Sequence, residues 1–309
     1  MSGNTHHHKN PFSEKLFEYR STEKKQLQLS LIITSVVLIV ELIGGLLSGS
    51  IALISDAGHM FTHSFAIGIS LVAIFIARKP LCHHRTFGLF RAEILAAFVN
   101  GLFLLIVAGF IVVEAVERIL HPRAILGGQM LFIAILGLLT NVASIWILHG
   151  SHKKDVNIRS VFLHMIADAA SSVGIIIAAI IILLTGWTIL DPLVSIGISA
   201  LILIWAYGIL KESTVILLEM APGGLNVHII SKDLKQTFPE IISMDSVHLW
   251  SITSDMLVFS AHATVRSELK NQNELIDKIG NFLTYKYHII ESTIQIDMEQ
   301  TPGKKPGME

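Results

Sequence analysis

Apolar runs long enough to cross a lipid bilayer fill the first two thirds of this chain, and they restrict the possible folds more than any other feature. An α-helix needs about 20 predominantly apolar residues to cross the hydrocarbon core. Runs of roughly that length recur at residues 29–47, 51–77, 94–116, 125–149, 161–184 and 192–210, with Gly, Ser, Pro or charged clusters between them. The pattern predicts a multi-pass α-helical membrane protein with six transmembrane helices.

The composition agrees with this prediction and excludes several other classes. Charged residues make up 15% of the 309 residues, whereas soluble domains contain about 25%. The net charge of −1 provides no basic field for nucleic acid. A single cysteine, Cys82, excludes an intrachain disulfide framework and a multi-cysteine zinc finger. The first 28 residues contain no apolar segment followed by a cleavage site, so we expect no cleavable signal peptide.

The distribution of Lys and Arg predicts the orientation of the helices. Most of these residues lie before the first apolar run and in the links that follow the second and fourth runs. The opposite side carries Arg118 and Arg123. Positive residues accumulate in cytoplasmic loops, so both termini are expected in the cytoplasm. We expect the membrane to be a bacterial inner membrane.

From residue 213 onward the sequence pattern changes. An amphipathic helix is predicted at 227–237 and a second helix at 268–285, with strands at 246–253, 255–266 and 292–298. This pattern predicts a small α+β domain with a three-stranded sheet. The expected domains are a cytoplasmic N-terminal arm (1–28), a six-helix transmembrane domain (29–212), a cytoplasmic α+β domain (213–300) and a disordered tail (301–309).

Two of the apolar runs contain ionisable side chains four residues apart. The second run carries His59 and His63, and the fifth carries His164 and Asp168. Positions i and i+4 lie on one face of a helix, about one turn apart. Ionisable groups inside a bilayer usually face the bundle interior or a water-filled path. Two such helices can bring four ligands around one ion, and imidazole with carboxylate suits Zn²⁺ best.

Several segments in this chain occur in the order known from one family. They are SIALISDAGHM, TFGLFRAEILAAFVNG, HMIADAASS, SVHLWSIT, SAHATV and STIQIDME. In this order they resemble the cation diffusion facilitators, which are zinc-type metal/proton antiporters, and the resemblance extends from about residue 29 to 299. It implies a divalent metal efflux transporter that exchanges Zn²⁺, with Co²⁺ and Cd²⁺ as further candidates, for H⁺ by alternating access. It also implies a metallochaperone-like cytoplasmic domain that forms a homodimer, and no enzymatic activity.

The resemblance assigns the transport site to the two pairs in the apolar runs. His59, His164 and Asp168 match the usual zinc-type ligands, whereas His63 stands where the family has Asp. Three neutral imidazoles and one carboxylate leave an occupied site with about one positive charge, which is costly in a low dielectric. Asp56 is expected to act as an outer carboxylate that fixes a ring tautomer. The alternative is a wetter site that binds metal more weakly.

The same ligands predict how metal and protons are coupled. Imidazole and carboxylate must be deprotonated to bind a metal, so metal binding and protonation compete. Free imidazole titrates near about 6.5, close to the pH of the cytoplasm. We expect Zn²⁺ to displace protons on the cytoplasmic side, and protons to displace Zn²⁺ after the helices open to the other side.

Two further metal sites are implied by the resemblance alone. Family members place ligands in the link that here contains His83 and His84, although Phe90 replaces one expected ligand.

In the C-terminal domain, the matching positions are His248, His262 and Asp297, which bind metal at the dimer interface in some members. Gln295 replaces a histidine expected there. An ordinary sheet with incidental histidines is an equal alternative for this second site.

Other polar residues inside the runs favour structural explanations. Glu41, Asn100 and Asn141 are expected to form interhelical hydrogen bonds rather than to line the ion path, and Ser171 and Ser172 to pack helices.

Two other functions stay open at this stage. One is a non-transporting metal-sensing or scaffold subunit, because His63 alters the site. The other is a membrane metalloenzyme, because diiron enzymes also carry histidines four apart, although they need more ligands at one cytoplasmic face.

Overall fold

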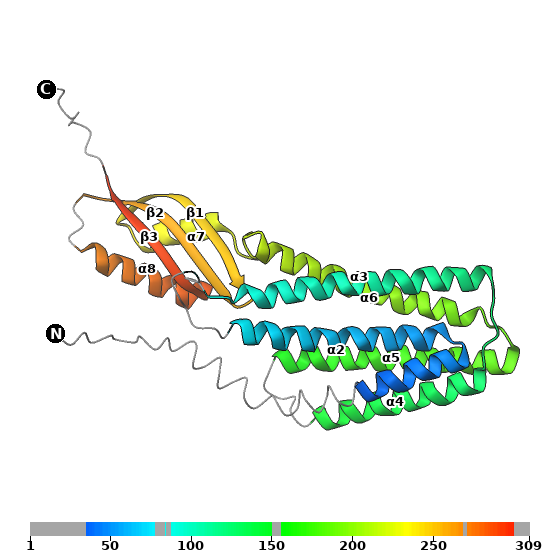
Figure 1. Ribbon diagram of the computed structural model, residues 1–309. Coiled ribbons are helices and arrows are strands. Elements are labelled where there is room, and N and C mark those ends of the chain that lie inside the picture. Colours follow the sequence, from blue (N-terminus) through cyan, green and yellow to red (C-terminus); the bar gives the residue numbers. More distant parts are fainter. Residues whose placement is uncertain (1–34, 78–83, 85–87, 150–155, 268–270, 300–309) are drawn as a thin grey trace. The chain divides into compact units, whose positions relative to one another are not determined.

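The computed structural model describes residues 35–77, 84, 88–149, 156–267 and 271–299, apart from the side chains of residues 63, 67, 143–149 and 156–167 (Figure 1). The chain divides into two compact units. Of the described residues, one unit contains 35–68, 102–149 and 156–206, and the other contains 69–77, 84, 88–101, 207–267 and 271–299.

Helices follow the apolar runs along the chain. They are Ser35–Ser48, α2 (Ile51–Ala77), α3 (Arg91–Leu120), α4 (Gly127–His149), α5 (Val156–Thr185) and α6 (Leu190–Leu217). Among the described residues, four helices are long and apolar enough to cross a membrane: α2, α3, the part Asp168–Thr185 of α5, and α6. With 23 residues, α4 is also about as long as the hydrocarbon core is thick. The number of spans, six, stays a prediction.

Large apolar side chains lie exposed on these helices. Phe75 of α2, Phe110 of α3 and Leu184 of α5 are each more than two thirds exposed. In a water-soluble protein such surfaces are rare, because exposed apolar area is costly. Contact with lipid removes that cost, so the exposed side chains agree with a membrane-spanning bundle.

A carboxylate from α6 fixes the beginning of α2. Gly49 has a φ of +73°, which lets the chain reverse tightly after the helix Ser35–Ser48. Asp191 is fully buried and accepts hydrogen bonds from Ser50 Oγ (2.5 Å), Ile51 N (2.7 Å) and Ala52 N (3.1 Å). A carboxylate at a helix N-terminus satisfies free N–H groups and interacts favourably with the helix dipole. Asp191 therefore joins the start of α6 to the start of α2.

The C-terminal part forms a three-stranded sheet in the order β1-β2-β3, from β1 (Ile241–Thr253), β2 (Met256–Val265) and β3 (Ile289–Met298). β2 pairs antiparallel with β1 and parallel with β3. Helices α7 (Val227–Thr237) and α8 (Gln272–Tyr287) cover one face of the sheet. Leu234 and Ile279 from these helices are buried against Phe259 of β2, which anchors the core.

Three boundaries in this domain differ from the sequence prediction. β1 begins at Ile241 rather than at residue 246, because its early residues pair with β2 through bulged register shifts. α8 begins at Gln272, since Asn271 caps it by accepting a hydrogen bond from Glu274 N. β3 begins at Ile289, directly after His288 ends α8 in a left-handed conformation.

Candidate metal centre

Helices α2 and α5 lie side by side (Figure 1), and polar residues of the two helices contact one another. His59 Nε2 lies 3.3 Å from Asp168 Oδ1. About one helical turn away, Ser171 Oγ lies 2.8 Å from Asp56 Oδ1. The structure therefore brings one residue of each predicted pair into contact across the two helices.

The residues around this contact bury His59 and Asp56 almost completely and Asp168 in large part. His59 is 4% exposed and Asp56 is 2% exposed, while the side chain of Asp168 is 18% exposed. All three face the interior of the helical unit. An ionisable group in such a place is costly unless it is paired or binds a cation.

The two contacts between α2 and α5 also show the relative direction of the helices. His59 contacts Asp168, and Asp56, three residues earlier on α2, contacts Ser171, three residues later on α5. The two helices are therefore antiparallel at this level. The other two predicted ligands are His63 of α2 and His164 of α5. The side chains of these two residues lie outside the described part of the structure.

Ser171 links the two acidic residues of the site. Its Oγ lies 2.8 Å from Asp56 Oδ1 and 2.8 Å from the carbonyl oxygen of Asp168. A hydroxyl group has a single proton to donate, so it serves one of these acceptors at a time. The sequence suggested only helix packing for Ser171. The only feature of the sequence that places Ser171 near the site is its position three residues after the predicted ligand Asp168.

A second serine joins the site to α4. Ser172 Oγ lies 3.1 Å from the carbonyl oxygen of Asp168, and it accepts a hydrogen bond from Asn141 Nδ2 at 3.2 Å. The predicted interhelical hydrogen bond of Asn141 is thus confirmed. By contrast, no partner is present among the described residues for Oδ1 of Asn100, which is also buried.

Helix α6 closes the other side of the site. The rings of Trp205 and His59 are 5.3 Å apart with an angle of 34° between their planes. Ile198, Leu201 and Ile202 line the same small cavity, whose volume of about 10 Å³ suits about one water molecule. The described side chains around His59 and Asp168 therefore leave space for little more than one water molecule. Sequence reasoning did not identify Trp205, because periodicity along α6 does not reveal which helix it faces.

The predicted site in the C-terminal domain is only partly assembled. His262 Nδ1 lies 3.7 Å from Asp297 Oδ2, and each side chain is about half exposed. His248 lies opposite Ser260 on the neighbouring strand, two residues from His262. No three His, Cys, Asp or Glu side chains gather around one point within the described residues.

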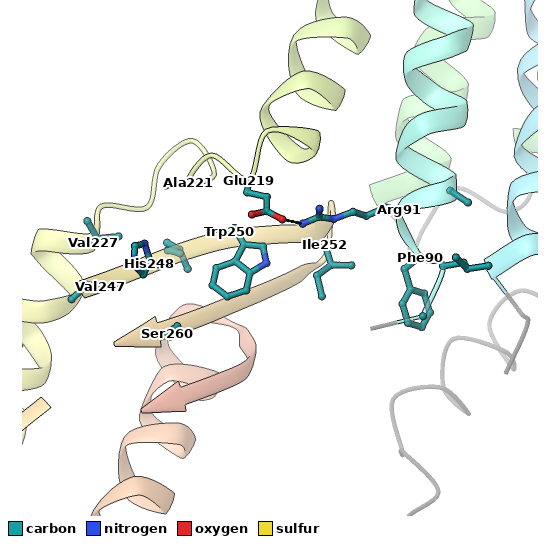
Figure 2. Close-up of a pocket in the computed structure, with 14 residues that line it drawn as sticks. Phe90, Arg91, Glu219, Ala221, Val227, Val247, His248, Trp250, Ile252 and Ser260 are labelled. Carbon is teal, nitrogen blue, oxygen red and sulfur yellow. Dashed lines mark hydrogen bonds and ion pairs between the residues drawn. The ribbon is translucent and has the colours of Figure 1, made fainter. Parts of the chain in front are cut away.

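A wide pocket lies at the start of α3 and the end of α6. Its volume is about 720 Å³, and its lining includes Arg91, Glu219 and Trp250. Figure 2 shows Arg91 directed toward Glu219, with an ion pair of 2.7 Å between them. Of the predicted loop site, His84 is exposed and His83 lies outside the described residues. Phe90, which replaces an expected ligand, lines this pocket.

Comparison with known proteins gives matches along nearly the whole chain. Residues 27–218 match the family description "Cation efflux transmembrane domain", and residues 222–299 match "Cation efflux protein, cytoplasmic domain".

Individual relatives are similar over most of their length. A protein of Pectobacterium atrosepticum named "Zinc transporter ZitB" is 43% identical over 282 residues, which cover 91% of this chain and 87% of the relative. The zinc transporter ZitB of Escherichia coli strain K12 is 40% identical, over 88% of this chain and 86% of the relative. A Bacillus subtilis protein named "Cadmium, cobalt and zinc/H(+)-K(+) antiporter" is 39% identical, over 89% of both chains.

Proposed function

Because this chain belongs to the cation efflux family, we propose that it is an integral membrane transporter that exports Zn²⁺ in exchange for protons. The names of its relatives support zinc as the substrate, and cadmium and cobalt as further substrates. The observation that carries the proposal is the contact of His59 with Asp168 between α2 and α5, which is largely buried.

Four side chains bind the transported ion in this proposal. His59 and Asp168 supply two ligands, and their separation of 3.3 Å fits two groups that turn toward a shared ion. His63 and His164 supply the other two, which the antiparallel register of α2 and α5 supports. Imidazole-rich sites favour Zn²⁺ and related ions over Mg²⁺ or Ca²⁺.

Asp56 orients the site without binding the ion. Asp56 contacts the hydroxyl of Ser171, and the same hydroxyl lies near the carbonyl oxygen of Asp168. Asp56 is thereby linked to α5 next to a proposed ligand. Outer partners of this kind hold ligands in the geometry that the metal needs. The negative charge of Asp56 also offsets part of the positive charge that remains when three imidazoles and one carboxylate hold a dication.

Competition between protons and metal couples the two fluxes. With the site open to the cytoplasm, Zn²⁺ binds only deprotonated ligands and so displaces protons. After the helices rearrange, protons from the other side displace the ion.

The cytoplasmic domain assembles the transporter as a homodimer, with both termini in the cytoplasm. His262 and Asp297 form half of a zinc site on the exposed face of the sheet, which ligands from His248 or a second copy complete. The loop residues His83 and His84 deliver zinc to the transport path.

Two alternatives are less well supported. A membrane metalloenzyme is disfavoured, because the family and its named members are transporters. A sensing or scaffold subunit with an inactive site predicts that substitutions of the ligands leave the zinc tolerance of cells unchanged, whereas a transporter predicts that they abolish it.

The test uses cells that lack their own zinc exporters. Wild type is expected to restore growth in zinc, and Asp168→Ala and His164→Ala are expected to abolish that growth. Asp255→Ala, which removes an exposed carboxylate from the β1–β2 turn, serves as the control and should behave like wild type. Equal tolerance for all four proteins would contradict transport and favour the sensing subunit.

A further inference from the structure

Glu41 is a buried acidic residue that the proposed site does not use. It lies on the helix Ser35–Ser48 and is 1% exposed. Among the described residues, its Oε2 has no hydrogen-bond partner. The expected interhelical hydrogen bond is therefore missing for this oxygen. A buried carboxyl group without a donor is costly, and far more so when it is charged.

The neighbouring helix makes room for this side chain. A Cβ atom at Gly137 of α4 would lie against Glu41 Oε1 and 3.3 Å from Glu41 Cδ. Only glycine leaves that space open, so the absence of a side chain at this position accommodates the carboxyl group. The pairing of an unsatisfied acid with a glycine suggests a function for Glu41 other than packing.

Glu41 also lies within electrostatic range of the metal centre. The charges of Asp56 on α2 and Asp168 on α5 act on it. The described side chains of α4, residues 127–142, include no titratable group. Three carboxyl groups that interact in a buried volume do not all ionise easily, because their charges repel. A bound dication reverses this effect and favours their ionised forms.

We propose that Glu41 is a proton-carrying carboxyl group of the transport cycle. It holds a proton while the centre is empty and releases that proton as H⁺ when Zn²⁺ binds nearby. It takes up a proton again when the ion leaves, so one carboxyl O–H bond breaks and re-forms in each cycle. Asp56 differs because its Oδ1 already has Ser171 as a donor. This inference rests on the proposed zinc/proton exchange.

The experiment measures protons exchanged per zinc ion in vesicles that contain the full-length protein. The substitution Glu41→Gln keeps the size of the side chain but removes the titratable group. We expect about one proton fewer per zinc ion, and zinc uptake that depends less on the pH gradient. Glu117→Gln is the matched control, since Glu117 is half exposed and paired with Arg123, and its ratio should equal that of wild type.

The outcomes separate this inference from the proposed function. Absence of zinc flux in wild type would overturn the function itself. Coupled flux in wild type with an unchanged ratio in Glu41→Gln would overturn only the assignment of Glu41.

Glu41→Asp provides the test if the glutamine variant does not fold. It keeps an acid but moves it by one methylene group, so we expect the wild-type ratio with a shifted pH midpoint of zinc uptake. An unshifted midpoint would count against Glu41 as a proton carrier.

Discussion

At the scale of single residues, the geometry of the proposed metal centre depends closely on Ser171. Its hydroxyl lies 2.8 Å from both Asp56 Oδ1 and the carbonyl oxygen of Asp168. Ser171 therefore connects Asp56 of α2 to the backbone of α5 beside the proposed ligand Asp168. Removing this hydroxyl should loosen the orientation of both acidic residues while leaving every proposed ligand in place.

We therefore expect Ser171→Ala to weaken zinc binding by about 10-fold, the lower end for outer partners of metal sites. The measurement is competition with a fluorescent chelator, using purified protein in detergent. Ser55→Ala is the control, because Ser55 is buried on α2, one residue from Asp56, and donates to the carbonyl oxygen of Ile51. Equal affinities for the two variants would show that Ser171 does not support the site.

Sequence spacing predicts part of this site and not the rest, for a physical reason. The i and i+4 spacing identifies which residues of one helix share a face, so it pointed to His59 and Asp168. Contacts between helices depend on their rotation and register, which spacing within one helix does not determine. The contact of Trp205 with His59 and that of Ser171 with Asp56 are both contacts between helices, so spacing does not predict them.

At the scale of elements, the junction of α2 with α6 is expected to stabilise the bundle. Asp191 accepts three hydrogen bonds at the start of α2, two of them from backbone N–H groups. Asp191→Asn keeps one acceptor oxygen but replaces the other with a donor, so a buried N–H loses its partner. The expected loss is about 1–3 kcal/mol of stability.

Thermal unfolding in detergent checks this expectation through a lower midpoint for Asp191→Asn. Ser199→Ala is the matched control, because Ser199 is buried on the same helix and donates only to the carbonyl oxygen of Ser195. A midpoint for Asp191→Asn no lower than that of the control would refute the stabilising junction.

The contact between α7 and α8 makes a prediction about high pH. Burial, followed by the hydrogen bond to Asp233, raises the pKa of Tyr287 to about 12 from an ordinary 10.0. Since the folded state favours the neutral phenol, its stabilising contribution is complete below about pH 10 and disappears as the pH rises through about 12.

Ultraviolet titration of tyrosinate measures this pKa directly. Subtracting the tyrosinate absorbance of Tyr287→Phe from that of wild type should give a titration curve centred near pH 12. The substitution Asp233→Asn should lower the pH at the centre of that curve. Tyr285→Phe, which removes a phenol that is 90% exposed, is the control. A difference curve for Tyr287 centred at an ordinary pH of about 10 would contradict the contact.

The sequence predicts which helices and strands form, but it predicts the residues at which they begin less accurately. Apolar runs predict membrane helices because the bilayer sets their length. The starts of β1, α8 and β3 differ from prediction because bulges, the cap at Asn271 and the left-handed His288 decide them. Such local choices depend on contacts that periodicity does not contain.

At the scale of the whole molecule, the proposed homodimer should respond to zinc. If His262 and Asp297 contribute to a zinc site shared between cytoplasmic domains, zinc should strengthen the dimer. We expect analytical ultracentrifugation of the full-length protein in detergent to show a tighter dimer with zinc, and His262→Ala to remove that effect. His228→Ala, at an exposed histidine on α7, is the control. A dimer of equal strength with and without zinc would exclude a structural ion at this interface.

The central claim is that one buried site, which includes His59 and Asp168, exchanges zinc for protons. The most direct measurement follows zinc and proton fluxes together in vesicles that contain wild type or Asp168→Asn, across a range of imposed pH gradients. We predict that wild-type zinc uptake rises with the opposing proton gradient and that Asp168→Asn abolishes both fluxes. Wild-type zinc uptake that ignores the pH gradient, or that persists unchanged in Asp168→Asn, would contradict the claim.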